Sequence, residues 1–294
     1  MKFSKTYTKN CILFLALIVM VSSSCKKDGN PNNLPDVSPA DYEGKIDGFT
    51  SSEEIFPNNL VAYWSFDGTK NELKSGTAPT TTANDAFAAG GVRGQALSLN
   101  AGYLYYATQF QKFKTDSFKS FTISAWVKVL NNGSKRTMLF QLARPGIFNG
   151  NINFALNTNA ATTVTNLTIQ PTFTTVGGGM QDNLNNNLKP TISANTWTHL
   201  ILTYNGATGI FDIWADAIKV GGFPNRGVGN NLFKSNEPSE VIIGSNYNGI
   251  PGKQVNTDVS FAPMTGQIDE MRIYNIAFPD AYVKALYNLG KANK

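Results

Sequence analysis

The feature of this chain that most constrains its fold is a series of short β-strand patterns, which starts at Leu60 and continues almost to the end. In the segment SFTISAWVKV, residues 120–129, apolar side chains occupy every second position and mostly polar ones lie between them. This alternation is typical of an antiparallel strand with one buried face. Gly and Asn turns separate the segments. Such a chain buries its apolar faces by packing one sheet on another.

The strand patterns and one helical pattern together predict the fold class. We expect strands at residues 60–66, 95–100, 120–129, 137–142, 151–157, 197–204, 210–216, 240–244 and 266–275. A turn joins two of them, so residues 197–216 predict a hairpin. A single helix is expected at residues 279–290, between Pro279 and Gly290. The prediction is an all-β fold, a two-sheet antiparallel jelly-roll sandwich with a short C-terminal helix.

Residues 1–24 have the parts of an export signal. Lysines come first, and an apolar run at residues 11–21 follows that is too short to span a bilayer. The run ends in SSSC, with the cysteine at Cys25. This ending resembles the lipobox of bacterial lipoproteins, in which the cysteine becomes the lipidated first residue. The resemblance implies an exported protein held at the bacterial outer membrane, and exposed at the cell surface, by a lipid on Cys25. The alternative is an ordinary signal peptide that is cut nearby.

The rest of the chain divides into a tether and one domain. Residues 25–58 are rich in Pro, Gly, Asn and Asp, which predicts a flexible tether. Residues 59–294 predict the jelly-roll domain, because no internal repeat divides them. Two long polar segments interrupt its strands, at residues 177–190 and 244–258. Loops of this length inside a compact domain are often functional.

Four stretches resemble a known family when they are taken in order. They are LVAYWSFDG (60–68), FTISAWVK (121–128), WTHLILTYNGATG (197–209) and GQIDEMRIYNIAFPDAYVKALY (266–287). Together they resemble the laminin-G-like, concanavalin A-type jelly roll of many bacterial lipoproteins, over about residues 59–290. The chain departs from that pattern at Pro279, where the family usually has Ser or Thr, and at residues 215–217, where it favours Asn-Gly or Asp-Gly.

The closing strand carries a carboxylate that needs a partner. Alternation places Asp269 on the buried face with Met271 and Ile273, and places Glu270 and Arg272 outward. Because an unpaired buried carboxylate is costly, some cation or donor must meet Asp269. The family resemblance implies a structural calcium ion at Asp269, with Asp67 as a second carboxylate ligand if the first and last strands pair. The alternative is that backbone N–H groups or an arginine satisfy Asp269.

The sequence offers little support for catalysis or for nucleic-acid binding. The net charge of +5 comes from 25 basic and 20 acidic residues without a basic cluster, so we expect no nucleic-acid partner. His199 is the only histidine, which excludes a His-rich zinc site. The related glucanases carry Glu-x-Asp-x-x-Glu on one strand, and no such triplet occurs here.

The leading hypothesis is therefore a non-catalytic, lectin-like module that binds a polysaccharide or other glycan. Aromatic rings and amides suit sugars, and the candidate contacts are Tyr105, Tyr106, Tyr247, Asn246 and Asn248. The alternative for these rings is a place in the core. The second hypothesis is an adhesion or assembly module that binds a protein in a surface complex. The third is a glycoside hydrolase or polysaccharide lyase of the same superfamily.

Overall fold

The computed structural model describes residues 42–294, of which residues 44–294 form one compact unit. Cys25 and the signal predicted at residues 1–24 lie outside the described residues. Within residues 42–294, no helix has both the length and the apolar character that crossing a bilayer requires.

The strands appear where the alternation predicted them, and the structure adds five more. The predicted strands are β1 (Leu60–Trp64), β3 (Gln95–Tyr106), β4 (Phe121–Val129), β5 (Arg136–Arg144), β6 (Ile147–Asn157), β9 (Thr198–Asn205), β10 (Ile210–Ala215), β12 (Glu240–Ile243) and β14 (Met264–Tyr274). The additional strands are β2 (Thr81–Ala89), β7 (Thr168–Thr174), β8 (Met180–Gln181), β11 (Ile218–Phe223) and β13 (Phe261–Ala262). Short 3₁₀ turns lie at Ser52–Glu54, Gln111–Phe113, Gly229–Asn231 and Tyr247–Gly249, and the helix α2 spans Asp280–Lys291.

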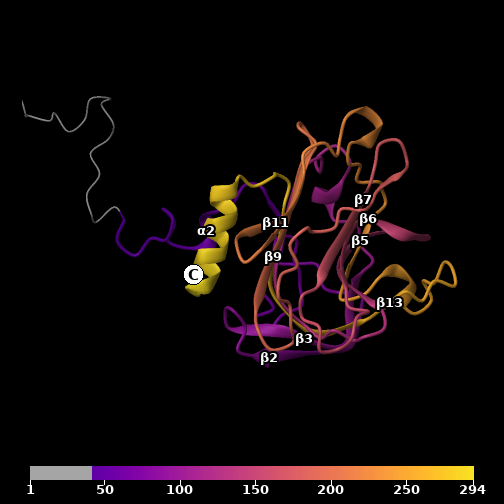
Figure 1. The fold of residues 1–294 in the computed structure, drawn as a ribbon, viewed down its shortest axis with the longest axis horizontal. Helices are drawn as coiled ribbons and strands as arrows, with labels where there is room; N and C mark the ends of the chain where they lie inside the picture. Colours follow the sequence, from indigo (N-terminus) through magenta and orange to yellow (C-terminus); the bar gives the residue numbers. More distant parts are fainter. Residues whose placement is uncertain (1–41) are drawn as a thin grey trace, which may run out of the picture. The chain divides into compact units, whose positions relative to one another are not determined.

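The strands form one hydrogen-bonded network that curls into two packed layers (Figure 1). Neighbouring strands follow the order β11-β10-β9-β4-β14-β3-β12-β5-β6-β7-β8, while β1 pairs with β14, β2 with β3 and β13 with β5. Strand β14 lies in the middle of this network, because it pairs with both β3 and β4. Among the described strands, β13 and β5 form the one parallel pair. The predicted all-β jelly roll with a C-terminal helix is confirmed.

The main core lies between the two layers and is rich in aromatic rings. Phe121 of β4 lies within 5.5 Å of Tyr204 and 5.2 Å of Phe233, measured between ring centroids. Trp64, at the end of β1, is completely buried in the same core. Such stacked and edge-to-face pairs stabilise a core by about 0.5–1.5 kcal/mol each beyond the burial of their area.

A second, smaller core lies on the outer face of β9 and β10, beneath α2. The helix buries Val283, Leu286 and Leu289, whose spacing of three residues places them on one face. Gly290 was predicted to end the helix, but it lies inside its last turn. A Cβ at this position would lie 2.8 Å from the Trp126 ring. The glycine therefore permits close packing of helix on sheet.

Residues 44–58 belong to this folded unit, which corrects the predicted boundary of the tether. Ile55 is buried in the second core, and the ring of Phe56 lies 4.4 Å from that of Tyr282 on α2. Asn288 of α2 also donates a hydrogen bond to Asp47 over 2.7 Å. A few apolar side chains in a Pro- and Gly-rich segment are enough to dock it, since the helix and sheet already provide an apolar surface.

A β-bulge in β14 reverses the predicted direction of Asp269. Asp269 pairs with Trp126 and Arg272 pairs with Ser124, so β14 contains one more residue than β4 between these pairs. Glu270, at the bulge, has a φ of +50°. The extra residue shifts the alternation. Asp269 therefore shares the outer face with Trp126, whereas Met271 and Ile273 enter the main core. The predicted common face of these three residues is wrong.

Candidate functional site

Asp269 accepts hydrogen bonds from the turn between β2 and β3, and Asp67 accepts one from the first residue of β3. Asp269 Oδ2 accepts from the N–H groups of Val92 (2.6 Å) and Arg93 (3.1 Å), and Oδ1 accepts from that of Glu270 (3.0 Å). Asp67 Oδ1 accepts from the N–H of Gln95 over 2.7 Å. The two carboxylates thus hold one turn, and the first and last strands pair as the sequence hypothesis required.

The groups around Asp269 match the alternative prediction, in which backbone N–H groups and not a calcium ion satisfy its carboxylate. Calcium takes six to eight oxygen ligands, whereas the neighbours of Asp269 are N–H donors. Residues 42–294 contain no group of three His, Cys, Asp or Glu side chains placed to hold a metal. These residues do not fit a calcium shell, and calcium binding stays a prediction. Burial raises the pKa of Asp269 to about 8, with Glu270 acting in the same direction and the N–H donors against it.

Glu270 and Arg272 are buried, not outward and exposed as the alternation predicted. Arg272 Nη2 lies 2.5 Å from Glu270 Oε2, and each residue is 3% exposed. Arg272 also contacts Glu53 at 3.3 Å, which links β14 to the N-terminal segment. Since Glu270 is bound to an arginine, it does not provide a free catalytic carboxylate beside Asp269.

The tyrosines predicted to contact a sugar are buried, which corrects that prediction. Tyr106 lies in the main core against Trp64, and its hydroxyl donates to the carbonyl of Lys70. Tyr105 and Tyr247 are each 3% exposed and pack together on the outer face of β3 and β12. The ammonium group of Lys253 covers both rings, 5.4 Å and 6.0 Å from their centroids. None of the three rings presents a free face.

The predicted amides serve the fold of their own loop. Asn248 Nδ2 donates to Asn256 and to the carbonyl of Asp258, and its Oδ1 accepts from the N–H of Val255. Asn246 is 5% exposed, and its carbonyl accepts from the N–H of Gly249. The polar character that suggested a sugar site in residues 244–258 reflects hydrogen bonds that hold the loop.

A hollow of about 510 Å³ lies elsewhere, on the outer face of β9–β11 beside the start of α2. We call it the β9–β11 groove. Its floor is a row of cross-strand partners, in which Asp212 pairs with Thr203 on one side and with Gly222 on the other. Residues 277–280 form one wall. The floor is open at Gly222 because glycine has no side chain. A Cβ at this position would lie 3.1 Å from Asp212 Oδ1, in tight contact. Its volume is within the range of small-ligand sites.

The groove combines apolar surface with polar groups that remain available. Ile210 and Phe223 supply apolar lining. Asn205 Oδ1 accepts from N–H groups of the β9–β10 turn, while its NH₂ group has no partner among the described residues and can donate to a ligand. Lys219 Nζ lies between two carboxylates, 3.0 Å from Asp212 and 3.7 Å from Asp280. The groove therefore offers donors, acceptors and an apolar surface, and its three charged groups sum to one negative charge.

Thr203 is the groove residue with the most informative environment. The residue as a whole is 4% exposed and borders the hollow, and its hydroxyl takes part in no hydrogen bond among residues 42–294. It is not one of the fully buried unpartnered polar atoms of those residues, so it is open to solvent in the hollow. Thr122, which pairs directly with Thr203, uses its own hydroxyl internally, donating to the carbonyl of Ile276 (2.8 Å) and accepting from the N–H of Phe278 (2.9 Å). Two adjacent threonines in one row therefore differ in whether the fold uses their hydroxyls.

Sequence reasoning missed this groove, although part of its signal was visible. Thr203, Asn205 and Asp212 occupy alternate positions on the predicted hairpin and point away from the main core. The pattern could have identified them as outward residues. It could not show that α2 returns beside them or that Gly222 leaves space.

The fold and the comparisons define the class of this protein. Antiparallel strands curled into a jelly roll, closed by one helix, define a β-sandwich of the lectin type. A family described as the concanavalin A-like lectin/glucanases superfamily, of laminin G type, matches residues 100–284, which is more than half of the chain. The chain belongs to this family. The predicted resemblance is confirmed. A search of curated proteins finds no match.

Several solved structures share the fold at low identity. The binding domain of Paraclostridial Mosquitocidal Protein 1 is 18% identical over 79% of this chain and 52% of that one, with a TM-score of 0.55. The botulinum neurotoxin serotype C1 binding domain is 12% identical over 80% and 52%, with a TM-score of 0.52. This chain thus spans about half the length of those binding domains.

A third structure is matched along nearly its whole length. Domain 4 of AbnA, an arabinanase from Geobacillus stearothermophilus solved with arabinotriose, is 18% identical over 78% of this chain and 98% of that one, with a TM-score of 0.49. At these identities the likenesses concern the fold alone.

Proposed function

We propose that this protein binds carbohydrate without cleaving it, and that the β9–β11 groove is the binding site. The observation that carries the proposal is Thr203, whose hydroxyl borders the groove, is open to solvent there and has no partner among the described residues. A hydroxyl that the fold does not use and that faces a hollow is available to a ligand, which replaces the water bound there. A sugar offers hydroxyls for Thr203, Asn205 and Asp212, and C–H faces for the apolar lining.

Binding without cleavage follows from the charges of the groove. A glycosidase needs one carboxylic acid that carries a proton and one carboxylate that acts as nucleophile or base. Asp212 and Asp280 are the two acids that line the groove, and the ammonium of Lys219 lies between them. An ammonium shared by both carboxylates forms an ion-pair network instead of an acid and a base. We expect no release of reducing sugar from any polysaccharide.

The test uses the threonine pair. We would first screen the purified protein on a glycan array and on insoluble polysaccharides, and then measure the affinity of the best glycan by calorimetry. Thr203→Val removes the free hydroxyl with little change of shape, so affinity should fall about 2- to 12-fold, the equivalent of one hydrogen bond of about 0.5–1.5 kcal/mol. The free energy of unfolding should hardly change, because Thr203 has no partner within residues 42–294 to lose.

Thr122→Val is the matched control. It leaves the groups at Ile276 and Phe278 without a partner, so stability should fall by about 1–3 kcal/mol. If Thr203→Val instead destabilised the fold and left affinity unchanged, the groove would not be the binding site. If the protein bound no glycan and captured a protein partner, the adhesion hypothesis would replace this one.

We also propose that a lipid on Cys25 anchors the domain at the bacterial outer membrane. The support is the SSSC sequence, which follows an apolar run too short to span a bilayer. Mass spectrometry of a membrane extract should find residues 1–24 removed and Cys25 modified. A Cys25→Ser variant should leave the membrane fraction, and its retention there would contradict the proposal. Protease treatment of intact cells would show whether the domain faces outward.

A further inference from the structure

A second hollow of about 370 Å³ includes Gly206 of the β9–β10 turn in its lining. It is lined by Lys119, Gly206, Val176, Leu232, Phe233 and Lys234. Gly206 follows Asn205, a lining residue of the groove, so the two hollows approach each other at the β9–β10 turn without sharing a lining residue. Adjacent Cα atoms are about 3.8 Å apart, which is less than the length of one sugar unit. We call this hollow the Lys119–Lys234 cavity.

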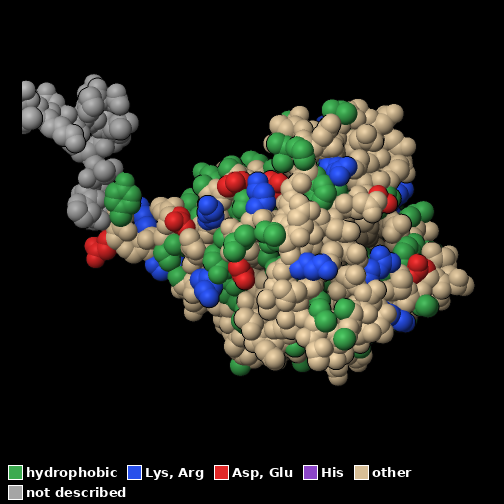
Figure 2. Space-filling model, in the orientation of Figure 1, with side chains coloured by type: hydrophobic (Ala, Val, Ile, Leu, Met, Phe, Trp, Pro, Cys, Tyr) green, Lys and Arg blue, Asp and Glu red, His purple; other side chains and the backbone are tan. Residues whose placement is uncertain are grey.

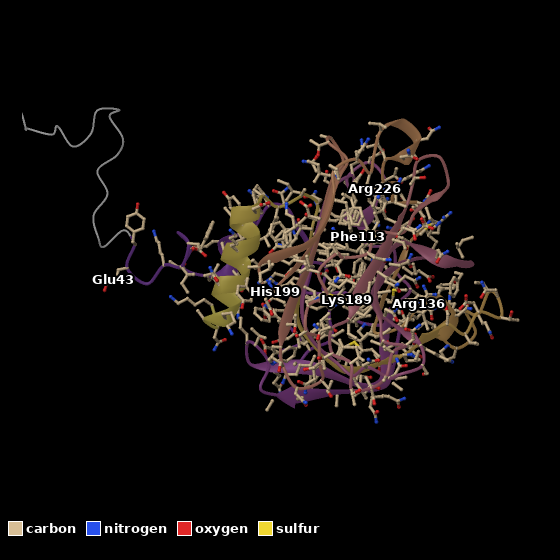
Figure 3. The ribbon with its side chains drawn as sticks, viewed as in Figure 1. Glu43, Phe113, Arg136, Lys189, His199 and Arg226 are labelled. Carbon is tan, nitrogen blue, oxygen red and sulfur yellow. The ribbon has the colours of Figure 1, made fainter. Side chains whose placement is uncertain are left out.

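The segment after β11 runs along the same boundary. The N–H of Arg226 donates to the carbonyl of Gly209 in the β9–β10 turn over 2.7 Å. Its guanidinium group lies 4.9 Å from the ring of Phe223, which lines the groove. Further along, Leu232 lines the second cavity. Figure 3 shows Arg226 at the end of the sandwich where these loops gather. Besides Lys219, Lys119 and Lys234, a fourth cation therefore lies close to the β9–β10 turn.

The two hollows differ in charge. In the groove, Lys219 is already paired with Asp212 and Asp280. In the cavity, neither Lys119 nor Lys234 forms an ion pair with any carboxylate of the described residues, and no acidic side chain lines it. On the face shown in Figure 2, by comparison, basic and acidic side chains are interspersed. Unpaired ammonium groups around an apolar floor attract a ligand that is anionic as well as apolar.

From this geometry we propose that the bound glycan extends from the groove across the β9–β10 turn, and that its unit in the Lys119–Lys234 cavity is an acidic sugar. The carboxylate of that unit lies between the two lysines, while its ring packs on Val176 and Leu232. The unit in the groove is neutral, because the groove already holds one excess negative charge. This inference rests on the proposed function and adds the class of glycan and a second subsite.

The experiment compares each acidic polysaccharide with its own neutral form. The probes are hyaluronan and unsulfated chondroitin, in which acidic and neutral sugars alternate, each in its native form and after reduction of the carboxylates to alcohols. At least one native probe should bind, and its reduced form should bind about 2- to 30-fold more weakly, as expected for two surface ion pairs. Added salt should remove most of this difference, since it screens exposed charges.

Variants assign the difference to the cavity. Lys119→Met with Lys234→Met should bring the affinity for the native probe down to that for the reduced probe. Lys189→Met with Lys284→Met, at two exposed lysines that line neither hollow, removes the same charge and should keep the preference. Thr203→Val should weaken the binding of both forms alike.

The two proposals fail in different ways. If neutral glycans bind through Thr203 but no native probe binds better than its reduced form, the acidic subsite is wrong and the proposed function stands. A preference that survives in the Lys119→Met, Lys234→Met variant also overturns the subsite. If no glycan binds in either form, the proposed function itself is wrong.

Discussion

The environment of His199 makes the stability of this fold depend on pH in a way that can be calculated. The ring is 1% exposed and stacks on Trp126 at 4.6 Å and on Tyr287 at 6.0 Å (Figure 3 places it beside α2). Nε2 is 2.7 Å from Ser124 Oγ, and Nδ1 is buried without a partner in the described part of the chain. Burial, with a smaller contribution from Arg272, lowers the pKa of His199 from 6.5 to about 3.

The sign and size of the effect follow from this shift. Above pH 6.5 the histidine is neutral in both states and the folded state keeps its full stability. As the pH falls from 6.5 toward 3, only the unfolded chain takes up the proton, so stability is lost. The loss cannot exceed about 1.4 kcal/mol per pH unit, and between pH 7 and pH 5 it amounts to about 2 kcal/mol.

Urea unfolding at pH 7 and pH 5 measures this loss when the wild type is compared with a variant that cannot titrate. In His199→Phe the ring still packs against Trp126 and Tyr287, and Ser124→Ala, added to it, removes the hydroxyl left without a partner. Because the pKa of Asp269 is raised, acidification stabilises the fold through this group, but this contribution is the same in the wild type and in the double variant. The wild type should therefore lose about 2 kcal/mol more than the double variant on acidification. Equal losses would refute the assignment of a buried neutral histidine.

Three further predictions concern the rest of the fold. Arg272→Met should lower the free energy of unfolding in urea by about 3–5 kcal/mol, because it leaves Glu270 buried and unpaired. Adding Glu270→Met should recover much of that loss. An equal loss for the single and the double variant would argue against a buried pair. Asp269→Ala should lower stability by about 1–3 kcal/mol, because it leaves N–H groups of the β2–β3 turn without an acceptor. The loss should be the same with calcium and with chelator. If the melting temperature of the metal-free wild type instead rises with added calcium, the predicted calcium ion is supported. Ile55→Ala should cost about 2–5 kcal/mol, while a neutral result would return residues 44–58 to the tether.

The sequence alone determined the class of fold. Alternation in segments such as residues 120–129 specifies which face of a strand is buried. Because the side-chain period is two, a shift of the strand register by one residue would expose the apolar face, so the register is restricted. Strands such as β7, which contains Pro171, were missed because hydrogen bonding to neighbours, and not local pattern, forms them. The helix was predicted to within one residue at each end, since its apolar spacing and its preceding proline are local signals.

Only the tertiary structure decided the sites. The bulge at Glu270 turns Asp269 to the other face, and a single inserted residue cannot be seen in a pattern that only counts alternation. The sequence predicted Tyr105 and Tyr247 as sugar contacts, but both are buried in the fold. The exposure of a side chain depends on which distant segments pack on it, and a local pattern does not contain that information. Likewise, Thr203 becomes a candidate contact only because α2 returns beside β9 and forms the wall of a groove. Local sequence thus specifies strands and their faces, while contacts between distant segments determine which polar groups remain free to bind.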